Sequence, residues 1–323
     1  MWTGSSGDRL IPKVDLARDI LERAGFGSKR SLFRIEIGFS NDVFSVDEEL
    51  VLKIGKSAED RLALEKEVFL CQLFAGRICS PEVVHADTSL NESDLPYIIY
   101  RKIPGDNLYT LWHLYSVEQR RKLVKEICDI LRVINETDYS GFAARFPAST
   151  ADKISDAPLN WHDHICSRIE HRLDQAEQSG AINTDSAQRI RMHVQAHHEA
   201  LREQTLALTY YDPHFDNFLV ADGMVTGILD FERTEIASID YVLDLVTRMV
   251  RYPRKYVSAH HEHLIRDEDY ADLLVWYREF YPEVFAFSSL EERLSLYLIE
   301  HSLSDLHYFP EYPSVLAELR ALL

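Results

Sequence analysis

The chain has 323 residues, of which 46% are apolar and 27% charged, a composition typical of a globular protein with one large or two smaller cores. Its net charge of −18 argues against a nucleic-acid partner, because phosphate backbones are bound by an excess of Lys and Arg. No uncharged stretch approaches the roughly 20 residues that a membrane span requires, so we expect no membrane partner and a cytoplasmic, unprocessed protein. The four cysteines form no CxxC pair, which indicates reduced thiols rather than a disulfide framework or a zinc site.

The first third of the chain predicts antiparallel strands and one helix. Residues 31–37, 43–46 and 50–54 alternate apolar and polar side chains, as strands with one buried face do. Residues 59–74 contain neither Gly nor Pro and place apolar side chains at helical spacing, which predicts a helix that stops near Gly76.

Two more strands are predicted at 81–84 and 97–100, before Pro104-Gly105 interrupts the pattern. We place a domain boundary there, because the periodicity changes from that of strands to that of helices. The chain is thereby divided into an N-terminal part, 1–104, and a C-terminal part, 105–323. The acidic excess falls mostly in the C-terminal part, which suits solubility and also a cationic small-molecule partner.

The pattern after residue 104 is mainly helical. Apolar side chains recur at a 3.6-residue period in 117–135 and 183–204, and further helices are expected from 258 onward. A small β-island interrupts them, with a strand at 206–210 and a hairpin at 218–229 whose Asp-Gly pair supplies the turn.

The stretch between Tyr211 and Glu232 carries the clearest chemistry. It contains Asp212, an asparagine five residues later at 217, and Asp230 at the end of the predicted hairpin. This spacing is typical of a kinase catalytic loop followed by a metal-binding turn. Phosphoryl transfer needs a carboxylate to accept the proton of the attacking hydroxyl, and an amide oxygen and a second carboxylate to hold Mg²⁺.

These residues resemble the signature of the aminoglycoside phosphotransferase family, H-G-D-x-x-x-x-N followed by a hairpin and I-D-F. On this resemblance Asp212 is the catalytic base, and Asn217 and Asp230 are the Mg²⁺ ligands. Asp240 and Asp244-Leu245 are similar to the family's G-D-x-x-x-D-L stretch. Tyr210-Tyr211 stands where the family usually has His-Gly.

The resemblance implies an α+β fold of the protein-kinase-like, two-lobe kind. Its N-terminal lobe, 1–104, is then an antiparallel sheet with one helix that binds the nucleotide. Its C-terminal lobe, 105–323, is then mainly helical and carries the catalytic loop and the acceptor site. The cofactors implied are Mg²⁺ and ATP or GTP.

Lys53 lies inside an apolar strand, where an unpaired ammonium group is costly. The string from Leu73 to Val84 resembles the family's L-A-G-x-x-x-x-P-x-V run, and aligning on it makes Glu67 the partner of Lys53. Glu65 is the alternative partner, since two residues along a helix point to different faces. A lysine that faces the surface from a strand is the commoner explanation for such a residue. On the resemblance, Lys53 contacts the α- and β-phosphates while Glu67 fixes its rotamer.

Two further segments are similar in position to nucleotide-binding parts of the family. The turn Gly38-Phe39-Ser40-Asn41 lies where the family covers the phosphates, so Ser40 and Asn41 are candidate phosphate contacts, although most hairpins have such turns. The segment from Tyr100 to Ile103 resembles the linker whose backbone contacts the nucleotide base. Arg101 and Ile103 are the candidates there, and an ordinary edge strand is the alternative.

Two other patterns receive no function. Gly55-Lys56-Ser57 resembles the end of a P-loop, but the earlier glycine that this motif requires would fall at Leu50. The pairs His197-His198 and His260-His261 are interpreted as solvated polar faces, because adjacent histidines on a helix point apart.

The leading hypothesis for function is transfer of the nucleotide γ-phosphate to a hydroxyl of an aminoglycoside or related antibiotic, which causes resistance by inactivation. A metabolic kinase for choline, homoserine, methylthioribose or another sugar is the second hypothesis. A non-catalytic nucleotide-binding protein is the third, suggested by Tyr210-Tyr211. We expect a monomer. Acidic residues near the C-terminus are candidates for a rim that binds a cationic substrate: Asp267, Glu268, Asp269, Asp272, Glu291, Glu292, Glu300 and Asp305. We expect only some of them to face the cleft and the rest to lie on solvated helix faces.

Overall fold

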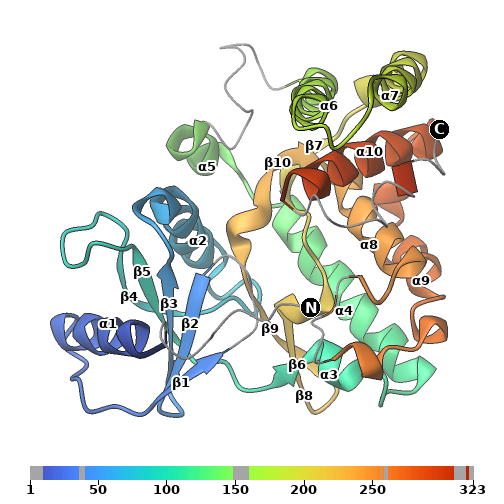
Figure 1. The fold of residues 1–323 in the computed structure, drawn as a ribbon. Coiled ribbons are helices and arrows are strands. Elements are labelled where there is room, and N and C mark those ends of the chain that lie inside the picture. Colours follow the sequence, from blue (N-terminus) through green and yellow to red (C-terminus); the bar gives the residue numbers. More distant parts are fainter. Residues whose placement is uncertain are drawn as a thin grey trace. The chain divides into compact units, whose positions relative to one another are not determined.

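The computed structural model describes residues 10–35, 41–147, 160–255, 257, 261–308 and 318–319 (Figure 1). Its contacts divide the chain into two compact units. The first unit consists of residues 1–115, 215–233 and 257–264, and the second of 116–214, 234–256 and 265–323. The predicted division at residue 104 stays a prediction. Within the described ranges, none of the helices has the length and apolar character needed to cross a membrane.

The first unit contains one five-stranded sheet, one three-stranded sheet and three α-helices among its described residues. Its elements are α1 Leu10–Arg23, β1 Leu32–Ile35, β2 Asn41–Val46, β3 Leu50–Gly55, α2 Arg61–Phe74, β4 Val83–Asp87, β5 Tyr97–Arg101, β6 Asp106–Asn107, α3 Leu108–Trp112, β8 Phe218–Ala221 and β9 Met224–Ile228. A short 3₁₀ turn, η1 Ala58–Asp60, precedes α2. Two others flank the hairpin of β8 and β9: η4 Phe215–Asn217 comes before it and η5 Phe231–Arg233 after it.

The five-stranded sheet is antiparallel throughout, in the order β1-β2-β3-β5-β4 (Figure 1). Successive side chains on a strand point to opposite faces, and β3 uses both. Leu50, Leu52 and Ile54 pack with Ile20 and Leu21 of α1 in one apolar cluster. Burying each such side chain contributes roughly 1.5–3 kcal/mol. Lys53 therefore points to the other face of the sheet.

The 3₁₀ turn η1, which leads directly into α2, begins at a capping box of Ser57 and Asp60 rather than at a phosphate-binding loop. Asp60 Oδ2 accepts hydrogen bonds from the backbone N–H groups of Lys56 and Ser57, both at 2.8 Å. Ser57 in turn accepts one from Glu59 N–H at 3.2 Å. These contacts satisfy amides at the start of η1, so the backbone N–H groups of Lys56 and Ser57 already have a partner within the chain and Gly55-Lys56-Ser57 is not a P-loop.

The segment that leads out of the large sheet is fixed to the hairpin of β8 and β9. Thr226 Oγ1 donates to Pro104 O at 2.7 Å, and Gly105 has φ +137°, where a Cβ would lie 2.6 Å from that hydroxyl. Ile103 lies against Gly227, where a Cβ would come within 3.1 Å of its side chain. Both glycines thus permit close packing of the linker on β9.

The described residues of the second unit are mainly helical and include a two-stranded sheet of β7 and β10. Its elements are α4 Val117–Asn135, α5 Ser140–Arg145, α6 Trp161–Gln178, α7 Thr184–His197, η3 His198–Arg202, β7 Leu206–Tyr210, β10 Thr234–Ser238, η6 Ile239–Tyr241, α8 Val242–Arg251, α9 Leu273–Phe280 and α10 Leu290–Tyr308. Helices α6, α7 and α10 lie side by side and share an apolar core around Trp161, Ile190 and Tyr297 (Figure 1).

The α+β class with an antiparallel N-terminal sheet and a helical C-terminal portion is therefore confirmed. The predicted helix at 117–135 and strand at 206–210 coincide with α4 and β7. Helices α1 and α6 were not predicted from the sequence, although Val14, Ala17 and Leu21 have helical spacing in α1.

Candidate active site

The first unit holds a buried ion pair between the large sheet and α2. Lys53 Nζ lies 2.6 Å from Glu67 Oε2 and 3.0 Å from Asp230 Oδ1. The side chains of Lys53 and Glu67 are 8% and 3% exposed, whereas that of Asp230 is 35% exposed. The pair predicted between Lys53 and Glu67 is present, and Glu65 is not the partner found here. An apolar strand thus carries an ammonium group because two carboxylates meet it.

The environment of Lys53 keeps it positively charged. Burial by itself lowers the pKa of Lys53, but the charges of Asp230 and Glu67 outweigh it and raise that pKa above its ordinary value. Burial raises the pKa of Glu67, against the lowering effect of Lys53. Tyr100 OH donates to Glu67 Oε1 at 2.7 Å, so each carboxylate oxygen of Glu67 has a donor. These contacts hold the Lys53 side chain in one rotamer.

Asp230 occupies a strained turn at the end of the hairpin. Its φ is +60°, in the left-handed region that is costly for residues other than glycine. The strands pair with Phe218 opposite Ile228, and Leu229 N–H donates to Asn217 O at 2.8 Å. Asn217 and the turn that carries Asp230 therefore lie at the same end of the hairpin. An amide and a carboxylate are oxygen ligands of the kind that Mg²⁺ prefers.

A third carboxylate, Glu232, belongs to the same group of charges. Burial first, and then the charge of Asp230, raise the pKa of Glu232, while Lys53 lowers it. Asn41 Nδ2 lies 3.5 Å from Glu232 Oε2, a long contact that orients the amide toward this carboxylate. Glu67 and Asp230 thus contact one ammonium group, and the charge of Glu232 also acts on it, which leaves a local excess of negative charge suited to a further cation.

Asp212 is placed by the second unit, in the loop that follows β7. Tyr210, at the end of β7, pairs with Thr234 of β10, and Tyr210 and Pro213 are buried. The ring of Tyr211 packs on that of Tyr241 with centroids 5.1 Å apart. The structure thus groups Lys53, Glu67, Asn217 and Asp230 in one unit, and the approach of Asp212 to them stays a prediction.

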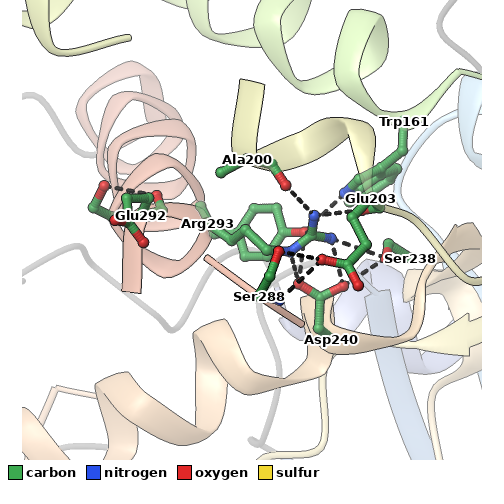
Figure 2. Close-up of polar contacts among 10 residues, drawn as sticks. Trp161, Ala200, Glu203, Ser238, Asp240, Ser288, Glu292 and Arg293 are labelled. Carbon is green, nitrogen blue, oxygen red and sulfur yellow. Dashed lines mark hydrogen bonds and ion pairs between the residues drawn. The ribbon is translucent and has the colours of Figure 1, made fainter. Parts of the chain in front are cut away.

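A fully buried arginine supports the segment that packs against β7. Arg293 and Asp240 both have completely buried side chains, and two guanidinium nitrogens meet the carboxylate at 2.6 and 2.8 Å. Arg293 also donates to the carbonyls of Ala200 and Glu203, as Figure 2 shows. Because Asp240 lies in η6, which contacts β7, this pair fixes the strand that leads to Asp212.

Of the other residues predicted to contact the nucleotide, Arg101 and Ile103 already make contacts within the protein. Ser40 lies outside the described residues. The backbone N–H of Arg101 donates to Glu82 O at 2.9 Å, so only its carbonyl can serve a nucleotide base. The Arg101 side chain is exposed and pairs with Glu82 at 2.9 Å. Ile103 follows β5 and packs on the hairpin through its side chain.

Several of the acidic residues expected to form a rim are paired inside the second unit. Asp269 lies 2.6 Å from Arg120, Asp305 lies 3.0 Å from Lys255, and Glu300 is held by two arginines, including Arg168 at 2.8 Å. The rim prediction was wrong for Asp269 and Glu300, which are buried, because internal cations neutralise them. The acidic residues of the set that are exposed are Asp267, Glu268, Asp272 and Glu291.

Sequence reasoning missed two residues of the site, Tyr100 and Glu232. The two-residue period of β5 places Tyr100 on the same face as Ile98, which pairs with Lys53. That period is a signal that could have found Tyr100. Glu232 could have been found as the second acid of the metal turn, two residues after Asp230.

Comparison with known proteins places this geometry in context. Similar solved structures include the aminoglycoside phosphotransferase APH(2'')-Ib bound to ADP, at 18% identity and a TM-score of 0.63, covering 94% of this chain and 95% of that chain. A thermostable mutant of APH(4)-Ia with AMP-PNP and hygromycin B matches at 16% identity and a TM-score of 0.66, covering 95% and 97%. At these identities the likeness establishes the protein-kinase-like fold of aminoglycoside kinases.

The curated protein sequences contain no match to this chain. The sequence model of the phosphotransferase enzyme family matches residues 32–278, a span that includes Lys53, Asp212, Asn217 and Asp230. Because this match covers most of the chain, the chain belongs to the phosphotransferase enzyme family.

Proposed function

We propose that this protein transfers the γ-phosphate of ATP or GTP to a hydroxyl group of a small molecule, with Mg²⁺ as cofactor. The observation that carries the proposal is the buried contact of Lys53 with Glu67 and Asp230, at 2.6 and 3.0 Å. A lysine held in this way presents a fixed positive charge to nucleotide phosphates. A buried ion pair of this kind adds little stability compared with apolar side chains, so a binding role accounts for it better than a structural one.

The residues of the metal turn fit a hard divalent cation. The side chain of Asp230 is 35% exposed, against 3% for that of Glu67, and Asn217 lies at the same end of the hairpin. Oxygen donors and an excess of negative charge favour Mg²⁺ over softer metals. In the proposal Asn217 and Asp230 hold this ion. The bound ion supplies charge neutralisation for the phosphate oxygens.

The proposal gives Asp212 the role of the catalytic base that accepts the proton of the attacking hydroxyl. Lys53 contacts the α- and β-phosphates, and Glu67 together with Tyr100 holds its rotamer. Ser40 and Asn41 are proposed to contact the phosphates. The nucleotide base is proposed to meet the backbone of Arg101, through its carbonyl, and of Ile103.

The substrate class proposed first is an aminoglycoside or related cationic antibiotic. Solved structures of similar fold include complexes with gentamicin and with kanamycin. Inactivation of such a compound would confer resistance, and we propose that the enzyme acts as a cytoplasmic monomer. The alternative, a metabolic small-molecule kinase, is favoured by the internal pairing of Glu300, Asp269 and Asp305, which removes negative charge from the expected rim.

The test is a transfer assay with mass detection. Wild-type protein is incubated with ATP or GTP and Mg²⁺, and with gentamicin, kanamycin, hygromycin B, choline, homoserine or methylthioribose in separate reactions. We expect one compound class to gain a phosphate, and Asp212→Asn to lower the transfer rate by about 10²–10⁴-fold while nucleotide binding is retained. Tight nucleotide binding by the wild type without transfer to any compound would favour the non-catalytic binding protein instead.

A further inference from the structure

A group of metal-ligating side chains lies in the second unit and shares no residue with the proposed Mg²⁺ site. It consists of His162 on α6 and His198 and Glu199 on η3, whose ligand atoms all lie within 4.8 Å of one another. We propose that these three residues form a binding site for a divalent transition-metal ion, with Zn²⁺ as the best match. From the sequence His198 was assigned no role, because adjacent histidines on a helix are expected to point apart, but its partner is a histidine 36 residues earlier.

His162 is oriented as a metal ligand. Its Nδ1 lies 2.7 Å from Asp163 Oδ1, and its Nε2 lies 2.8 Å from His198 Nδ1. A charged carboxylate can only accept a hydrogen bond, so Nδ1 of His162 carries the proton and Nε2 keeps a lone pair. A carboxylate behind a histidine is the arrangement that fixes the tautomer and ring of metal-binding imidazoles. The His162 side chain is also 10% exposed, which limits alternative rotamers.

The two histidine nitrogens are close to chelating distance. Zn–N bonds of about 2.0–2.1 Å in a tetrahedral site separate the two nitrogens by roughly 3.3 Å. With the tautomer of His162 that Asp163 selects, the 2.8 Å contact is a hydrogen bond that His198 Nδ1–H donates to the lone pair of His162 Nε2. A metal ion takes the place of that shared proton after the rings separate by roughly half an ångström, with the proton of His198 moved to its other nitrogen.

Glu199 supplies the third ligand and keeps the site open. Its Oε1 lies 3.5 Å from His198 Nδ1, while its Oε2 accepts a hydrogen bond from Arg202 Nε at 2.6 Å. The Glu199 side chain is 63% exposed, which leaves water or an exogenous ligand room to complete a four-coordinate site.

The donor set selects the ion. Two imidazoles and one carboxylate suit Zn²⁺, Co²⁺, Ni²⁺ or Cu²⁺, whereas Mg²⁺ and Ca²⁺ require more oxygen ligands. Millimolar Mg²⁺ in a nucleotide assay should therefore leave this site free. Binding would join the start of α6 to η3, the segment before β7, and so stabilise the second unit by mass action.

The test is a titration of the full chain with Zn²⁺ in excess Mg²⁺, followed by isothermal calorimetry. We expect one high-affinity Zn²⁺ per chain, a loss of affinity of about 100-fold in His198→Gln, and about 10-fold losses in Glu199→Gln and Asp163→Asn. The matched control is the double variant His193→Gln/His197→Gln, which alters a pair one turn apart on α7 with rings 4.5 Å apart and should bind Zn²⁺ like the wild type.

Circular dichroism and nucleotide-induced thermal shifts establish that each variant is folded, and His198→Gln is preferred to His162→Gln because His198 is more exposed. Co²⁺ serves as a second probe, since its visible absorption reports coordination. The proposal is overturned if folded wild-type protein binds no Zn²⁺ saturably, or if affinity survives in His198→Gln and is lost in the control variant.

Discussion

Replacing Lys53 by Met tests whether Lys53 neutralises the buried carboxylate of Glu67, as the ion pair in the structure indicates. The variant leaves Glu67, with a side chain only 3% exposed, without its cation. Removing one partner of a buried pair costs about 3–5 kcal/mol. The Tyr100 hydroxyl still donates to Glu67, and Asp230 is partly solvated, so we expect the low end of this range. A cost of about 3 kcal/mol lowers the folding equilibrium constant more than about 100-fold.

The loss of folding free energy in Lys53→Met should depend on pH, and the ionisation of Glu67 determines whether the loss grows or shrinks as the pH rises. Burial raises the pKa of Glu67 and Lys53 lowers it, so removal of Lys53 raises that pKa further. A carboxyl group with a raised pKa in the folded state favours folding most below its ordinary value of 4.5, and this contribution is lost as the pH rises through the folded pKa. Lys53→Met should therefore lose less stability at about pH 5 than at about pH 8.

Urea unfolding of four proteins at both pH values measures these quantities: the wild type, Lys53→Met, Glu67→Met and the double variant. Replacing both partners by apolar side chains removes the unpaired charge, so the double variant should lie within about 1 kcal/mol of the wild type. A cost below about 1 kcal/mol for Lys53→Met, or a double variant whose cost equals the sum of the single costs, would refute the reasoning.

Three further predictions concern other charged residues. Arg293→Met leaves Asp240 buried without its cation and should lower the free energy of unfolding in urea by about 3–5 kcal/mol, and a loss below about 1 kcal/mol contradicts this. Asp230→Gly should have a free energy of unfolding about 1 kcal/mol higher than that of Asp230→Ala, because glycine adopts φ +60° without strain. Thermal unfolding measures the difference, and equal melting temperatures of the two variants would exclude strain. Glu300 has, despite burial, a pKa lowered to about 2 by Arg168 and Arg172, so its stabilising effect is present above 4.5 and lost as the pH falls toward 2. Acid titration of unfolding should show a shallower pH dependence in Glu300→Gln than in the wild type, and an unchanged slope would argue against the pairing.

Local chemistry was enough to predict several elements of the fold. The alternation of side chains predicted a strand at 50–54, and the structure has β3 there, with Leu50, Leu52 and Ile54 in one apolar cluster. Periodic apolar side chains predicted α4, and Asp222-Gly223 predicted the hairpin turn, with φ +52° and +69° at the two residues. These features depend on neighbours along the chain.

By itself the sequence also determined which residues were candidates for the site, because the spacing of Asp212, Asn217 and Asp230 is a local motif. Only the tertiary structure decided which side chains meet. Glu65 and Glu67 are both plausible partners from spacing, but two residues apart on a helix they face opposite ways, and packing of α2 on the sheet brings Glu67 to the lysine. The internal pairing of Glu300 and the contact of His162 with His198 were equally beyond sequence reasoning, since contacts between elements depend on how faces pack rather than on distance along the chain.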